Sequence, residues 1–209
     1  MSPAARSPAA APLGTRIALL GWGSLLWDLD DLAPWVEGAW RLGAGPRFPL
    51  EFSRVSAKRL GSLTVVLDDA HGALCPTHAI VSVREGIHAA AQDLARRERC
   101  TLARIGALCL ESGFERAASP GVSAHVAAWC RAEGWRGAVW TDLESNFAES
   151  TGTAFSLEAG AAYLRTLKGA ALDEAVRYIT EAPAATDTPL RRALEEAPWW
   201  QAARTERGY

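Results

Sequence analysis

Near its start the chain reads Ile17-Ala18-Leu19-Leu20-Gly21-Trp22-Gly23-Ser24-Leu25-Leu26-Trp27. The first four residues form a short apolar run, which is typical of a buried β-strand, and the glycines after it indicate a turn. Glycines also let the backbone approach a ligand closely, and consecutive amides after a strand suit a carboxylate or a developing oxyanion. The stretch therefore predicts a strand that leads into a ligand-binding loop. Its spacing excludes the dinucleotide fingerprint G-x-G-x-x-G, because position 26 is leucine.

The rest of the chain alternates between strand and helix patterns. Glycines and prolines predict irregular structure up to a strand over residues 50–56, and β-branched residues over 62–67 and 77–83 predict an antiparallel hairpin. One more strand is expected at 137–141. Helical spacing covers residues 86–99, 123–133, 156–168, 172–181 and 189–196, with Ser156 and Thr188 as N-caps. No repeat or linker appears, so we expect a disordered leader over 1–15 and a single α+β domain over 16–209, with helices around a largely antiparallel sheet.

Composition limits the classes of function. The 209 residues carry a formal net charge of −2, so a general affinity for nucleic acid or an anionic membrane lacks its main driving force. No apolar run approaches the length needed to cross a bilayer, and residues 1–12 lack the apolar region typical of a secretory signal. The four cysteines form no C-x-x-C pair, which is typical of reduced thiols, and we expect a cytoplasmic protein.

Glu98 is the most informative single residue. On the predicted helix it falls within about 20° of Ile87 and about 40° of Leu94, on the stripe that faces the core, whereas the neighbouring arginines point elsewhere. A buried acid requires a partner or a function. One interpretation is a structural salt bridge, with Arg104 or a strand arginine, or a frayed helix end; the other is a general acid/base.

The glycine loop and the helix together resemble the γ-glutamylcyclotransferase superfamily. The loop 20–27 is similar to the Gly-Tyr-Gly-Ser-Leu-x-Trp form of its glutathione-acting branch, and Arg96-Arg97-Glu98 is similar to the Arg-Arg-Glu segment of that branch. Phe52, Arg54, Ser56 and the strand 63–67 add a looser likeness. The resemblance covers about residues 16–100. Trp22 departs from it, because the family usually carries tyrosine there.

The resemblance implies a barrel-type sheet with flanking helices and a cofactor-independent enzyme without a metal. Glu98 would be the catalytic proton shuttle as the substrate's α-amine attacks its own γ-carbonyl and 5-oxoproline is released. The residues that would contact the substrate are Gly21, Trp22, Gly23, Ser24, Leu25, Arg54 and Ser56. The leaving group stays open among glutathione, γ-glutamyl amino acids, γ-glutamylamines and a biosynthetic intermediate, and so does the oligomeric state.

Other residues support rival hypotheses. His71, Cys75 and His78 are spaced closely enough to meet one metal ion, with Asp68 or Asp69 as a fourth ligand, and Cys75 with His78 also suits a hydrolase or acyltransferase. The strand-end residues Asp142, Glu144 and Asn146 favour a solvated loop, but they also suit the wall of a site, and Glu144 is the second choice for the proton shuttle. The tail Trp199-Trp200 docks on its own domain or on a partner. A non-catalytic module that binds a small ligand is the alternative to an enzyme.

Overall fold

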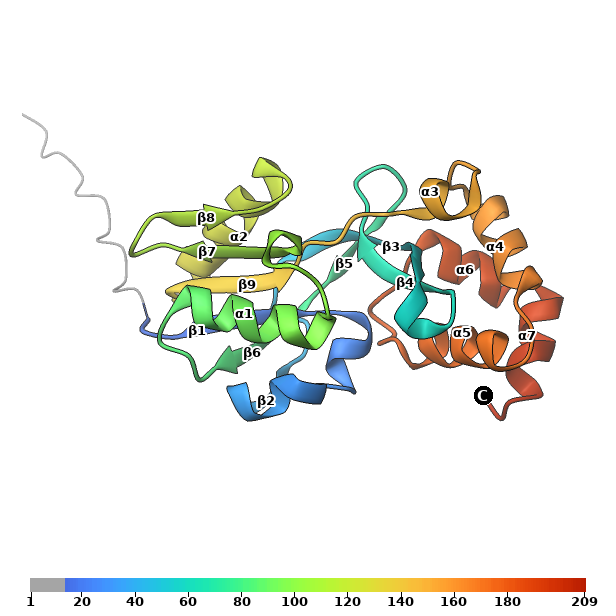
Figure 1. The fold of residues 1–209 in the computed structure, drawn as a ribbon, viewed down its shortest axis with the longest axis horizontal. Helices are drawn as coiled ribbons and strands as arrows, with labels where there is room; N and C mark the ends of the chain where they lie inside the picture. The colour runs from blue at the N-terminus through green and yellow to red at the C-terminus, as the bar shows by residue number, and fades with distance from the viewer. Residues whose placement is uncertain (1–13) are drawn as a thin grey trace, which may run out of the picture.

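The computed structural model describes residues 14–209, and the expected leader lies outside them except for its last two residues. Gly14 belongs to the fold, because its backbone N–H donates to the carbonyl of Gly134 at 2.9 Å. This part of the chain contains two sheets, seven α-helices and four short 3-10 helices, of which Gly23–Leu26 lies in the glycine loop (Figure 1). Within it, no helix combines the length and the apolarity that crossing a bilayer requires.

The larger sheet has six strands in the order β2-β6-β1-β9-β7-β8. These strands are β1 Ile17–Gly21, β2 Val36–Arg41, β6 His78–Ser82, β7 Ile105–Cys109, β8 Phe114–Arg116 and β9 Gly137–Thr141. The β1 and β9 pair is parallel, whereas every other neighbouring pair is antiparallel. The expectation of a largely antiparallel sheet is therefore confirmed, but the sheet is open and the barrel-type prediction is not borne out.

The smaller sheet has three strands, with the long β3 at its centre. They are β3 Arg47–Ser56, β4 Ser62–Leu67 and β5 Ala73–Pro76. The predicted hairpin is wrong, because β4 pairs with β3, and β6 belongs to the other sheet. The chain leaves the small sheet at Thr77, whose backbone N–H and hydroxyl both donate to the carbonyl of Pro46. This switch cannot be seen in strand propensity, which reports strands but not their partners.

The helices follow the predicted apolar spacing closely. They are α1 Ile87–Glu98, α2 Pro120–Glu133, α3 Phe147–Thr151, α4 Leu157–Thr166, α5 Ala170–Glu181, α6 Pro189–Glu195 and α7 Pro198–Thr205. Both predicted N-caps are confirmed, since the hydroxyls of Ser156 and Thr188 accept from the N–H groups of Ala159 and Arg191. Helices α3 and α7 were not predicted, and neither were strands β2, β5, β7 and β8.

Alternation along β1 divides the core into two layers. Ile17 and Leu19 pack with α1 on one face of the large sheet, while Ala18 and Leu20 join a cluster that includes α2. That second cluster also reaches the small sheet and helices α4 to α7, which gather beyond β3 and β4 (Figure 1). Trp200 of α7 is 1% exposed, so the tryptophan tail docks on its own chain.

Candidate functional site

A cavity of about 300 Å³ lies where the glycine loop, the turn between β3 and β4, and the C-terminal end of α1 meet. Five of the predicted site residues line it, namely Trp22, Ser24, Arg54, Ser56 and Glu98. Gly21, Gly23 and Leu25 do not line it. Thr141, Leu143 and Asn146 add the end of β9 and the segment after it.

The three loop residues that miss the cavity hold the loop in place instead. A Cβ at Gly21 would lie 2.4 Å from the ring of Trp40, and Leu25 is buried in the cluster below α1. Gly23 has a φ of +56°, and a Cβ there would lie 2.6 Å from the Tyr178 hydroxyl oxygen. The glycines are therefore required by close packing and by left-handed backbone, not by direct contact with a ligand.

Glu98 is the last residue of α1, and its side chain is 16% exposed. The helix ends here because Arg99 adopts the left-handed conformation, with a φ of 53°. A carboxylate in the last helical turn faces the negative end of the helix dipole, which is unfavourable unless a cation compensates for it. Arg97 supplies that cation, since its Nη1 lies 2.7 Å from Glu98 Oε1.

Arg97 links the two halves of the site and corrects the prediction that it points away from the core. Its side chain is only 3% exposed. The Nη2 group donates to Ser24 Oγ at 3.3 Å, and the guanidinium also donates to the carbonyl of Asp28. A single guanidinium therefore bridges the glycine loop and Glu98, which brings the predicted loop and the predicted acid into one site.

The segment after β9 fixes Arg54 against the cavity. Val55 and Asn146 exchange two hydrogen bonds, of 2.8 Å and 3.1 Å, between the backbone of β3 and the amide side chain. Arg54 Nη1 donates to the carbonyl of Glu144 at 2.8 Å. Burial lowers the pKa of Arg54, and neighbouring Arg104 acts in the same direction. Asn146 thus takes part in the site as a positioning residue, whereas the sequence favoured a solvated loop at this position.

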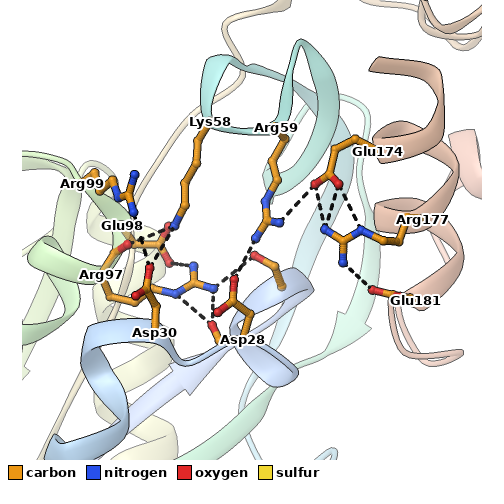
Figure 2. A network of polar contacts seen from close by, with 11 residues as sticks. Asp28, Asp30, Lys58, Arg59, Arg97, Glu98, Arg99, Glu174, Arg177 and Glu181 are labelled. Carbon is orange, nitrogen blue, oxygen red and sulfur yellow. Dashed lines mark hydrogen bonds and ion pairs between the residues drawn. The ribbon is translucent and has the colours of Figure 1, made fainter. Parts of the chain in front are cut away.

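The wall of the cavity is strongly cationic. Its charged residues are Arg54, Lys58, Arg59, Arg97 and Arg99 against one acid, Glu98. A chain of ion pairs runs from this wall to α5, as Figure 2 shows. Arg59 lies 3.4 Å from Asp28 and 3.1 Å from Glu174, and so connects the loop after the first strand to α5.

Tyr178 of α5 is the residue that sequence reasoning missed. It lines the cavity, is 4% exposed and lies beside the glycine loop. Burial raises its pKa, the charge of Glu98 raises it further, and hydrogen bonds from the backbone of Ser24 and Val65 oppose this. Periodicity predicts the helix that carries Tyr178, but no local signal connects the helix to a loop more than 150 positions earlier.

The structure does not support a shared metal site or a paired thiol and base at His71, Cys75 and His78. Within residues 14–209, no group of three or more histidine, cysteine or acidic side chains is placed to hold a metal ion. Cys75 lies in the small sheet, where burial raises its pKa, whereas His78 lies in the large one. The Nδ1 atom of His78 accepts from the N–H of Gly43, and His71 lies 3.1 Å from Asp68. The two histidines therefore have separate structural partners.

Asp142 and Glu144 line a different cavity, also of about 300 Å³. Asp68 and Asp69 line the same cavity, and no lysine or arginine does. Asp142 is 5% exposed, and burial raises its pKa. Glu144, the second choice for the proton shuttle, is therefore outside the cavity that holds Glu98.

Comparison of the chain with models of known protein families, with curated proteins and with solved structures found no match. The chemistry of the site therefore has to be inferred from its own residues.

Proposed function

We propose that this protein is a γ-glutamylcyclotransferase-like enzyme of the cytoplasm, which releases 5-oxoproline from a small γ-glutamyl compound. One observation carries the proposal: the guanidinium of Arg97 joins the hydroxyl of Ser24 to the carboxylate of Glu98 at the wall of a cavity. An intramolecular cyclisation needs a proton shuttle and a binding surface within hydrogen-bond reach of one substrate. Glu98 is the candidate proton shuttle, and the residues around Ser24 are the candidate binding surface, in a cavity of about 300 Å³.

Each step of the reaction has a candidate residue. Glu98 accepts the proton from the α-amine as its nitrogen bonds to the γ-carbonyl carbon. It returns the proton to the leaving amine as the former amide bond breaks. Arg54 binds the α-carboxylate, because a guanidinium without a carboxylate ion pair among the described residues is suited to a charged ligand.

Stabilisation of the oxyanion falls to the loop and to Tyr178. Tyr178 lines the cavity, and its hydroxyl lies beside Gly23 of the loop, so its O–H is placed to donate toward the developing charge. This assignment replaces the hydroxyl that the family's tyrosine would bring to position 22, where this chain has tryptophan. Trp22 instead packs edge-to-face on Phe48, with ring centroids 5.9 Å apart.

The test is the release of 5-oxoproline from a panel of γ-glutamyl substrates. Wild type and Glu98→Gln are compared after circular dichroism has shown that both are folded. Glutamine keeps the shape of the side chain but cannot shuttle a proton, so kcat is expected to fall about 10²-fold or more. Release at equal rates would overturn the role of Glu98, and no release from any substrate by wild type would overturn the proposed activity.

The ion pair between Glu98 and Arg97 is the observation that favours the rival function, a non-catalytic binding module. In that case Glu98 stabilises the loop and performs no chemistry. Binding of a γ-glutamyl compound by calorimetry, together with no 5-oxoproline release by wild type, would support the binding module.

A further inference from the structure

The cavity wall has more cationic than anionic side chains, and the cationic groups that lack a full carboxylate partner lie at two positions. Arg97 is matched by Glu98 at 2.7 Å. Arg59 is held by Asp28 and also by Glu174. Among residues 14–209, no carboxylate forms an ion pair with Arg54, so the first surplus charge is at this guanidinium.

The second surplus lies beside Glu98. Lys58 and Arg99 share the single carboxylate of Asp30, at 3.9 Å and 3.7 Å. Both distances exceed that of a hydrogen bond, and Lys58 Nζ instead donates to the carbonyl of Arg97 at 3.3 Å, an uncharged group, so the charge of neither cation is fully compensated. Figure 2 shows these two side chains together on the Glu98 side of the network. An anionic group placed here would meet two cations.

The reacting half of a γ-glutamyl compound has a negative charge for only one of these two cationic positions. Its γ-carboxyl is tied up in the amide bond, and its only negative charge is the α-carboxylate, which Arg54 binds in the proposed function. The second place is therefore available to a charge on the leaving half. A neutral leaving half would leave the charges of Lys58 and Arg99 with only the shared carboxylate of Asp30 to compensate for them.

We infer that the enzyme selects substrates whose leaving group carries an anionic group such as a carboxylate, and that Lys58, assisted by Arg99, is the specificity-determining residue. The inference rests on the proposed function. Lys58 contributes more because its side chain is 28% exposed, against 70% for Arg99, and water screens it less. Burial lowers the pKa of Lys58, and Arg97 acts in the same direction, so an anion at this position would relieve an existing cost.

A matched pair of probes tests the inference. γ-Glutamylglycine and γ-glutamylglycinamide have nearly the same shape and differ by one carboxylate. For wild type, kcat/KM is expected to be at least about tenfold higher for γ-glutamylglycine. In Lys58→Met this ratio is expected to fall to about threefold or less. Lys168→Met, which removes an exposed lysine far along the chain on the loop after α4, is the control and should keep the wild-type ratio.

A second readout separates failure of the inference from failure of the proposed function. Calorimetry with Glu98→Gln measures the affinity for each probe without turnover. Cyclisation of both probes at equal kcat/KM would overturn the inference and leave the function standing. Tighter binding of γ-glutamylglycine without 5-oxoproline release by wild type would overturn the function and support the charge selection. A ratio that Lys58→Met leaves unchanged would overturn the assignment to Lys58.

Discussion

The segment 141–146 lines two cavities of similar volume and opposite charge. On the side of the glycine loop it contributes Thr141 and Asn146 to a wall with five cations and one acid. On the other side it contributes Asp142 and Glu144 to a cavity with four acids and no lysine or arginine. Polar residues at a strand end thus indicate that a cavity is near, but their own charge does not show which cavity suits the substrate. A carboxylate-bearing substrate fits the cationic one.

The largest effect is expected from removal of the Arg97 guanidinium, which connects the glycine loop to Glu98 at the cationic cavity. Arg97→Met loses the contacts with Glu98, Ser24 and Asp28 and leaves a carboxylate without its partner. We expect the free energy of unfolding to fall by about 3 kcal/mol, and kcat/KM by about 10²-fold because the acid is misplaced. Urea denaturation and 5-oxoproline release measure the two effects.

Arg96→Met is the control for Arg97. Arg96 is 60% exposed, and its partner Asp93 keeps a second ion pair with Arg84. Its loss should cost less than about 1 kcal/mol. Equal effects at positions 96 and 97 would contradict the account of Arg97 as the link between loop and helix.

The next prediction concerns stability alone and tests the packing of the glycine loop. Gly23→Ala places a Cβ against Tyr178 and Val65 and also forces alanine into left-handed backbone, so we expect a cost of about 3 kcal/mol. Gly43→Ala measures the cost of left-handed backbone alone, because Gly43 has a φ of +69° and no atom lies within 4 Å of the added carbon. Its expected cost is about 1 kcal/mol. Urea denaturation of the two variants gives the difference, and equal costs would contradict close packing at Gly23.

The smallest expected effect belongs to the acidic cavity. Burial raises the folded-state pKa of Asp142 above its ordinary value of 3.8, and Glu144 adds to the effect. The folded protein therefore holds this proton more tightly than the unfolded chain, and the resulting stability is lost as the pH rises through the raised pKa. Asp142→Asn cannot titrate, so its stability relative to wild type should increase from about pH 4 to about pH 7.

Urea denaturation of wild type and Asp142→Asn at several pH values provides this measurement. Asp69→Asn, an exposed residue of the same cavity, controls for the loss of one negative charge. A stability difference that decreases with pH would contradict the burial of a charged Asp142.

Local sequence patterns predicted those parts of the fold that depend on local forces. Helical spacing located α1 and therefore Glu98. Ser156 and Thr188 are the N-caps of α4 and α6, as the sequence predicts. Local patterns could not predict which strands pair, because pairing depends on contacts between segments that are distant in the sequence. Strand β2 has mostly exposed residues at a sheet edge, so it shows no apolar alternation, and β6 joins the large sheet because the chain turns away at Thr77.

The site could be predicted only where its residues carry a local signal. Ser24 follows two glycines, and Glu98 interrupts an apolar helical stripe, so both could be identified. Arg97 and Tyr178 could not, because a buried arginine looks like a surface residue until its partners are known, and a tyrosine on an apolar helix face looks like core. Their roles come from contacts across 73 positions for Arg97 and Ser24, and from the packing of α5 on the loop.

The most direct test of the central claim compares the two cavities by their acids. Rates of 5-oxoproline release from γ-glutamylglycine are measured for wild type, Glu98→Gln and Glu144→Gln, each shown to be folded by circular dichroism. The account predicts a loss of about 10²-fold or more for Glu98→Gln and less than about twofold for Glu144→Gln. A large loss for Glu144→Gln with Glu98→Gln still active would place the chemistry in the acidic cavity and contradict the account.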